Sequence, residues 1–180
     1  TGSQGITTDG LASDDLCNLT VNKSAGTATL NTNVWVSGNA TTTAGTLDIS
    51  TRTFQVDTKL TVEGGALSAG SGVLDANGDV LISGGTLTAP GAGAFTIGGS
   101  YNNSGGTFTA NSGTVTFDSA STGKTLAGTM IGTSAFYTLI FNGSGGGWTF
   151  SNNASTTNNF VYTLGTVTAP TLLSVAGSWT

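Results

Sequence analysis

The sequence has little of the chemistry that most enzymes need. Histidine is absent, cysteine occurs once, and glutamate and arginine each occur once, as Glu63 and Arg52. Most general-base, nucleophile and transition-metal arrangements cannot be assembled from such a set. Arg52, Asp57 and Lys59 lie close together, but charges near a turn are usually a solvated surface group. We therefore expect no catalytic activity.

Charge is equally scarce, because only 7% of the 180 residues are charged and the formal net charge is −5. Four basic residues leave no cationic track able to neutralise several phosphates, so no nucleic-acid partner is expected. No apolar run approaches the roughly 20 residues needed to span a bilayer, so no membrane insertion is expected. The chain opens without a charged segment followed by an apolar one, which predicts either a removed signal segment or an excised portion of a longer protein.

The lone cysteine, Cys17, excludes a disulfide framework within the chain. We interpret Cys17 as an inert, buried thiol, and an intermolecular disulfide is the alternative. Stability must then come from apolar burial and backbone pairing.

A short phrase of glycine, a small residue and an apolar residue returns along nearly the whole chain, which is the strongest signal in the sequence. From Gly26 to Gly165 it advances about 20 residues per step, within the range of solenoid coils. The apolar members are predicted to form one inward ladder: Leu47, Leu67, Leu87, Phe108, Met130 and Val167.

Within most steps an alternating apolar pair follows about nine residues later, as alternation in a half-buried strand requires. These pairs are Val34 and Val36, Phe54 and Val56, Phe95 and Ile97, Val115 and Phe117, and Leu173 and Val175. Leu60 with Val62 and Val80 with Ile82 add a third strand to some coils. Residues 16–22 also echo residues 136–142 at an offset of 120, which equals six coils of 20 and predicts an internal duplication.

These periods predict an all-β fold, a single-stranded parallel β-helix of about 20 residues per coil and about eight coils. At about 4.8 Å per coil the rod would be roughly 40 Å long. We expect a polar N-terminal segment at residues 1–15, acting as a partial cap or a donated strand, and a solenoid domain at residues 16–180. No cap follows the apolar residues Leu172, Leu173, Val175 and Trp179, so they are predicted to form an assembly interface.

Three further patterns suggest ligands. Asp75, Asn77 and Asp79 alternate like the oxygen ligands of a calcium loop. However, Val80 stands where the loop needs glycine, and Thr86 where it needs glutamate. A simple turn is therefore the favoured interpretation, and a calcium site is the alternative. No other cofactor is expected. Pairs of the form Thr-x-Thr are predicted to point outward on one flat face, as in ice-binding solenoids, although threonine also suits any exposed strand position. These pairs are residues 27/29, 86/88, 107/109, 114/116 and 166/168.

Aromatic residues crowd the C-terminal part of the chain. Facing outward they could stack on sugars, and facing inward they would fill a wider core, which is the favoured interpretation. They are Phe136, Tyr137, Phe141, Trp148, Phe150, Phe160, Tyr162 and Trp179.

The phrases at residues 83–88, 113–117 and 135–142 resemble the repeats of large bacterial surface and secreted β-solenoid proteins, such as filamentous haemagglutinins and autotransporter passengers. The resemblance implies an extracellular or cell-surface rod, a right-handed parallel β-helix, and transfers no functional residue. The uncapped C-terminal end and the nearly uncharged repeat surface favour a self-assembling filament or surface-layer subunit whose partners are copies of itself, joined head to tail. The alternatives are a stalk or carbohydrate-binding segment of an adhesin, with surface glycans as partners, and an ice-binding protein.

Overall fold

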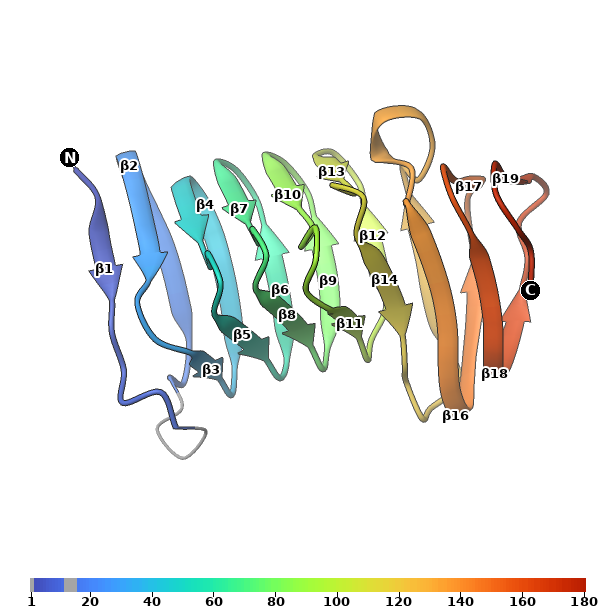
Figure 1. Ribbon diagram of the computed structural model, residues 1–180, viewed down its shortest axis with the longest axis horizontal. Helices are drawn as coiled ribbons and strands as arrows, with labels where there is room; N and C mark the ends of the chain where they lie inside the picture. The colour runs from blue at the N-terminus through green and yellow to red at the C-terminus, as the bar shows by residue number, and fades with distance from the viewer. Residues whose placement is uncertain (1, 12–15) are drawn as a thin grey trace.

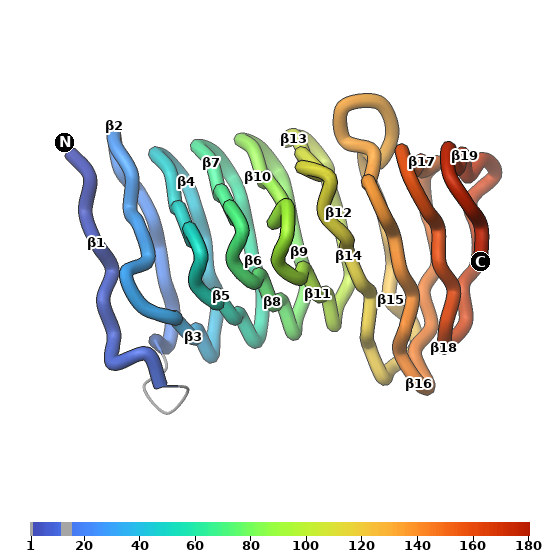
Figure 2. Tube along the Cα trace, in the orientation of Figure 1, coloured from blue at the N-terminus to red at the C-terminus, as the bar shows by residue number. Residues whose placement is uncertain are grey.

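The computed structural model describes residues 2–11 and 16–180 and confirms the predicted architecture, a parallel β-solenoid of about eight coils with about 20 residues per coil. Figure 1 shows the coils following one another along the long axis, with the two termini at opposite ends of the rod. The Cα trace in Figure 2 shows the same regular winding. Residues 132–134 form a single 3₁₀ turn, η1 (Gly132–Ser134).

Each coil has three strand positions, which we call faces A, B and C in chain order. Face A contains β1 (Gln4–Ile6), β7 (Ala66–Ser68), β10 (Thr86–Thr88), β13 (Thr107–Thr109), β17 (Ala154–Thr156) and β19 (Leu173–Val175). Face B contains β3 (Val34–Val36), β5 (Thr53–Val56), β8 (Val73–Ala76), β11 (Phe95–Ile97) and β14 (Thr114–Phe117). Face C contains β6 (Lys59–Val62), β9 (Asp79–Ile82), β12 (Tyr101–Asn103) and β15 (Lys124–Gly128).

Four long strands turn a corner and so belong to two faces. β2 (Leu19–Leu30) and β4 (Asn39–Asp48) run from face C to face A, whereas β16 (Thr138–Phe150) and β18 (Phe160–Thr168) run from face B to face C. Their pairings shift register at the corner, as between Asn22 and Thr27 of β2. Every pairing between successive coils is parallel, so identical positions of the coil lie above one another.

The core consists of columns of apolar side chains, one from each coil. On face A, Leu47 pairs with Leu67, Leu67 with Leu87, and Leu87 with Phe108, and all four are buried. The alternation of each strand explains this, since every second residue points inward and its neighbours point to solvent. The predicted ladder is therefore confirmed from Leu47 to Phe108.

One of the other predicted members, Val167, lies on a different face, because some of the later coils are longer. From Leu47 to Phe108 successive coils advance by 20 or 21 residues, but Tyr101 pairs with Leu126 and Phe117 with Phe141, which are steps of 25 and 24. The phrase at Gly165 consequently falls on face C, where Val167 pairs with Trp148 and is half-buried. Met130 is buried and bridges to Ala154 on face A.

The same lengthening overturns two other expectations. Leu173 and Val175 pair with Ala154 and Thr156 on face A, not with the face B pairs that they resemble. The echo at an offset of 120 also joins different faces, since residues 19–21 lie on face C and residues 139–141 on face B. It is a likeness of strand sequence, not a structural duplication.

Candidate functional site

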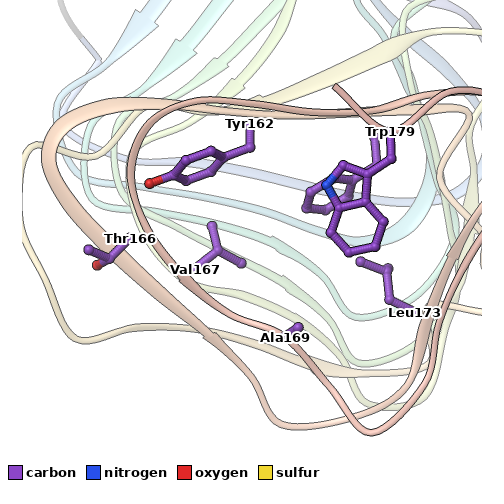
Figure 3. Close-up of a pocket in the computed structure, with 7 residues that line it drawn as sticks. Tyr162, Thr166, Val167, Ala169, Leu173 and Trp179 are labelled. Carbon is purple, nitrogen blue, oxygen red and sulfur yellow. The ribbon is translucent and has the colours of Figure 1, made fainter.

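The C-terminal end of the solenoid carries a hollow of about 390 Å³. Its lining comes from all three faces of the last coil and comprises Phe160, Tyr162, Thr166, Val167, Ala169, Leu173 and Trp179. Figure 3 shows Tyr162 and Trp179 on opposite sides of the hollow, with Val167 between them and Leu173 below Trp179. The hollow is therefore apolar and bounded by two aromatic rings.

Local contacts hold these two rings in place. The Trp179 ring stacks at a tilt on Phe160, with 5.0 Å between ring centroids, and residue 179 makes a parallel bridge to residue 160. The Tyr162 hydroxyl donates a hydrogen bond to the carbonyl of Gly165, at the corner between faces B and C. Trp179 is nevertheless 61% exposed and Tyr162 45% exposed. Two aromatic side chains with defined local contacts thus remain exposed at this end.

The residues predicted as an assembly interface all lie at this end, but only some share the hollow. Leu173 and Trp179 line it, whereas Leu172, 57% exposed, and Val175 lie outside its lining. The sequence predicts Tyr162 and Val167 as core residues and does not single out Ala169, so none of the three is predicted to lie at this end. The signal for them is the apolar alternation within residues 160–169, which the corner at residues 163–165 interrupts.

The N-terminal end carries a second, larger hollow of about 560 Å³. It lies between β1 and the first part of β2 and is lined by residues 4–6, 19–23 and 28. Ile6, Leu16 and Leu19 are half-buried members of the core here, just as Val167, Leu173 and Val175 are at the other end. Lys23 Nζ donates a 2.8 Å hydrogen bond to Gln4 Oε1 at the rim of this hollow. Both ends therefore present incomplete core layers.

The predicted N-terminal segment contributes a strand to its own chain. β1 pairs in parallel with residues 28–30 of β2, and the Thr8 hydroxyl donates to the carbonyl of Asn33 at 2.8 Å. Thr1 and residues 12–15 of that segment lie outside the described residues. Cys17 is exposed near the N-terminal hollow, so the expectation of a buried thiol is wrong. Its position just after the Leu16 bridge to Val36 puts it at a corner, where side chains face solvent.

The calcium candidates each have a separate hydrogen-bond partner. Asp75 accepts from the Thr96 hydroxyl, Asn77 donates to Asp57, and Asp79 accepts from the backbone N–H of Ser100. Asp75 belongs to β8 on face B and Asp79 to β9 on face C, on opposite sides of a corner. Within residues 2–11 and 16–180, no three Asp, Glu or Cys side chains gather in a group that could hold a metal ion.

Arg52, Asp57 and Lys59, the charged residues that lie close together in the sequence, are found one coil before the calcium candidates. Asp57 Oδ1 accepts hydrogen bonds of 2.8 Å from Gln55 Nε2 and from Asn77 Nδ2. Arg52 is exposed, and Lys59 is half-buried at the start of β6. The Asp57 carboxylate thus takes part in a hydrogen-bond network with two side-chain amides along the corner.

Asp118 is the acidic group whose environment changes its titration most clearly. Partial desolvation raises its pKa, the nearby Asp75 carboxylate raises it further, and a backbone hydrogen bond opposes both. A folded-state pKa above the unfolded value means that ionised Asp118 destabilises the fold at neutral pH, and that this penalty is relieved as pH falls through the folded-state pKa.

We expect Asp118→Asn to raise the melting temperature by about 1–2 °C at pH 7, because the side chain is largely exposed and its charge well screened. At about pH 3, where the aspartate is protonated in both states, the two proteins should melt together. Thermal unfolding followed by circular dichroism at both pH values measures this. An equal difference at both pH values would show that the effect is not electrostatic.

Three buried polar atoms have no partner among the described residues: Tyr101 Oη, Asn103 Oδ1 and Trp148 Nε1. Burial raises the pKa of the Tyr101 phenol, so this group stays neutral. Asn103 uses its amide to donate to the Thr129 carbonyl at 3.0 Å and to the Ser134 hydroxyl at 3.3 Å. Ser134 Oγ accepts in turn from the N–H of Phe108. This network ties the η1 turn to the core where the coils lengthen.

The threonine pairs do not all share a face. Three of them align along face A, in columns where Ala66, Ser68 and Asp48 interrupt the hydroxyl array. Thr114 and Thr116 lie on face B, and Thr166 and Thr168 on face C, so the expectation of one flat face is wrong for these two pairs. The reason is again the changed coil length. A continuous threonine surface is not formed.

Most of the C-terminal aromatic residues face inward, as favoured. The buried ones are Phe136, Phe141, Trp148, Phe150 and Phe160. Tyr137 is half-buried, and Tyr162 and Trp179 are exposed, so the inward interpretation is wrong for the last two. They belong to the last coil, which has no further layer above it in this structure.

Comparison with protein-family models, curated proteins and solved structures finds no significant match. No helix within residues 2–11 and 16–180 has the length and hydropathy to cross a membrane. Proposals about function must therefore come from the geometry of the two ends and the surface between them.

Proposed function

We propose that this chain is a structural element of the cell surface that stacks end to end with copies of itself into a filament or surface layer. The observation that carries the proposal is the pair of incomplete core layers, one at each end. Ile6, Leu16 and Leu19 at one end and Val167, Leu173 and Val175 at the other are half-buried core residues that a further coil would cover.

The backbone supports the same proposal. β1 pairs only with β2, and β19 only with β17, so each strand has one edge without a partner among the described residues. An edge of unpaired N–H and C=O groups is a template for another strand. Because β1 and β19 both lie on face A and each has a free edge, we propose that β1 of one copy pairs with β19 of the next. Contacts of this head-to-tail kind do not close on themselves and produce filaments.

Charge favours this contact. The last charged residue is Lys124, so residues 125–180, including every residue of the C-terminal hollow, carry no charged side chain. Burying this end therefore desolvates no ion, and no like charges face each other across the junction.

The test is negative-stain electron microscopy at rising protein concentration, with size-exclusion chromatography beside it. The unmodified chain should form uniform fibres. The double variant Leu173→Asp/Val175→Asp should remain monomeric, because it places two charges in the layer that the next copy would bury.

A matched control is Thr107→Asp/Thr109→Asp. It makes the same change on alternate residues of a face A strand, but at exposed positions in the middle of the solenoid. It should assemble like the unmodified chain. Monomeric rods of the unmodified chain at every concentration would refute the proposal.

A second candidate is the stalk or carbohydrate-binding segment of an adhesin, in keeping with the resemblance to bacterial surface solenoids. The observation that favours it is the pair of exposed rings, Tyr162 and Trp179, beside one hollow, since sugars stack on such rings. A glycan array separates the two candidates. Binding by a monomer that Trp179→Ala abolishes would support the adhesin.

A further inference from the structure

We infer that Asn77 and Gly78, at the corner between β8 and β9, form a site of spontaneous covalent modification that loosens this corner. The Asn77 side chain closes onto the backbone nitrogen of Gly78, loses ammonia and becomes aspartate or isoaspartate. The site lies in the middle of the solenoid and is independent of the proposed assembly at its ends. The Asn-Gly sequence occurs twice in the chain, at residues 77–78 and 142–143, and the structure treats the two differently.

The reaction needs only the two residues and water. The backbone nitrogen of Gly78, after giving its proton to hydroxide, attacks the side-chain carbonyl carbon Cγ of Asn77. A Cγ–N bond forms, the Cγ–Nδ2 bond breaks, and Nδ2 takes up a proton from water and leaves as ammonia. Water then opens the five-membered imide. Attack at Cγ gives aspartate, and attack at the backbone carbonyl carbon gives isoaspartate. Glycine favours ring closure because it has no side chain to obstruct it and the widest range of backbone angles.

The corner leaves the attacking nitrogen free. On one side, the N–H of Asn77 donates to the carbonyl of Val56 at 2.9 Å. On the other, the N–H of Asp79 donates to the carbonyl of Thr58 at 3.1 Å. Between them, the N–H of Gly78 has no acceptor among the described residues. Ring closure therefore breaks no hydrogen bond of the attacking group.

The Asn77 side chain is also accessible. Residues 77 and 78 lie in a bend outside the strands, and Asn77 is exposed. Its Nδ2 donates a 2.8 Å hydrogen bond to Asp57 Oδ1 in the preceding coil. Both partners are exposed to water, which competes for the same groups, so this bond opens at little cost. Water also reaches the imide that forms here.

The second Asn-Gly sequence is held in a different way. Asn142 and Gly143 both lie within β16, and Gly143 is buried. The strand is paired on both sides at this point, because residue 141 pairs with Phe117 of the preceding coil and Asn142 with Leu164 of the following coil. An extended strand held on both sides must unfold locally before its nitrogen can reach Cγ. The structure therefore selects Asn77.

Either product changes the corner. Aspartate at position 77 has no N–H to donate to Asp57 and brings a like charge beside that carboxylate. Isoaspartate carries the main chain through its side chain and so adds one atom to the backbone. The corner has no room for a longer path, since even an added Cβ on Gly78 would clash with the carbonyl oxygen of Thr58. The modified chain is therefore less stable than the original.

Peptide mapping by mass spectrometry tests the site. The folded chain is incubated in mildly alkaline buffer made with heavy-oxygen water, then unfolded and cut with trypsin. Cleavage after Lys59 and Lys124 places Asn77 on the fragment 60–124 and Asn142 on the fragment 125–180. Conversion at Asn77 should be at least about tenfold faster than at Asn142, and each product should carry one heavy oxygen.

Two controls separate the structure from the sequence. In guanidinium chloride the two sites should react at similar rates, since the same dipeptide is then unrestrained. Asn77→Gln keeps a side-chain amide but would need a six-membered ring, so position 77 should show no conversion. Equal rates at Asn77 and Asn142 in the folded chain, or conversion at Asn77 only after unfolding, would overturn the inference.

Thermal unfolding measures the loosening of the corner. A sample converted at Asn77 should melt about 2–4 °C below a fresh sample, the shift expected for a modest local loss in a chain of this size. The Asn77→Gln protein should melt at the same temperature before and after incubation. A fully converted sample that melts like the fresh one would show that the corner tolerates both products and would overturn its proposed loosening.

Discussion

Replacing Phe141 with alanine is expected to lower the free energy of unfolding by about 3–5 kcal/mol, the range for removing a large aromatic side chain from a rigid core. Phe141 is fully buried and lies at the centre of the C-terminal aromatic cluster. Its ring centroid is 5.1–5.8 Å from those of four other rings, which are Phe117, Trp148, Phe150 and Phe160.

The reason for so large an effect is that these contacts cross three coils. Phe117 belongs to the preceding coil and Phe160 to the following one, so a cavity at Phe141 weakens two coil interfaces together. In a repeat protein stability is carried largely by contacts between neighbouring repeats. The aromatic pairs add about 0.5–1.5 kcal/mol each beyond the area that they bury.

Guanidinium unfolding followed by circular dichroism and by tryptophan fluorescence measures the loss. The matched control is Ile140→Ala, on the same strand but facing outward and only half-buried, which should cost about 1 kcal/mol or less. A Phe141→Ala loss as small as that of the control would mean that the cluster does not hold the coils together.

Gly65→Ala is expected to destabilise the protein by several kcal/mol, the second-largest effect that the structure predicts. Gly65 lies at the corner between faces C and A with φ +63°, and an added Cβ would lie 2.1 Å from the carbonyl oxygen of Gly45, in the coil below. Backbone cannot move aside within a stack whose spacing is fixed by hydrogen bonds.

Gly123→Ala separates the two contributions. Gly123 also has a left-handed backbone, with φ +80°, but an added Cβ would meet nothing within 4 Å. It should therefore cost only the conformational part, about 1–2 kcal/mol. Equal losses at both positions, measured by denaturant unfolding, would show that close stacking of the corners contributes nothing.

The sequence was sufficient to predict the regular half of the solenoid. Between about residues 26 and 117, coils of 19 to 21 residues keep each apolar residue above its counterpart, as Leu67 above Leu47 and Val80 above Leu60 show. A strict period translates directly into a column, because parallel pairing in register is the only way to bury the same position of every coil.

In the later coils the sequence does not predict which face each residue occupies, because a repeat phrase no longer marks one face once the coil length changes. The glycine phrase predicts Val167 on the face of Leu47, and the alternating pair predicts Leu173 on the face of Val34, but Val167 lies on face C and Leu173 on face A. The wider coils need the large rings of Phe141 and Trp148 to fill them.

The candidate site depends partly on the sequence alone and partly on the tertiary structure. The sequence by itself determined that the C-terminal end is apolar and uncharged, because that depends only on which residues stand there, such as Leu173 and Trp179. Only the tertiary structure decided that Tyr162, Val167 and Ala169 join them around one hollow at this end. The physical reason is that each residue's face depends on the summed length of all the coils before it, so one longer coil moves every later residue to a different place in the cross-section.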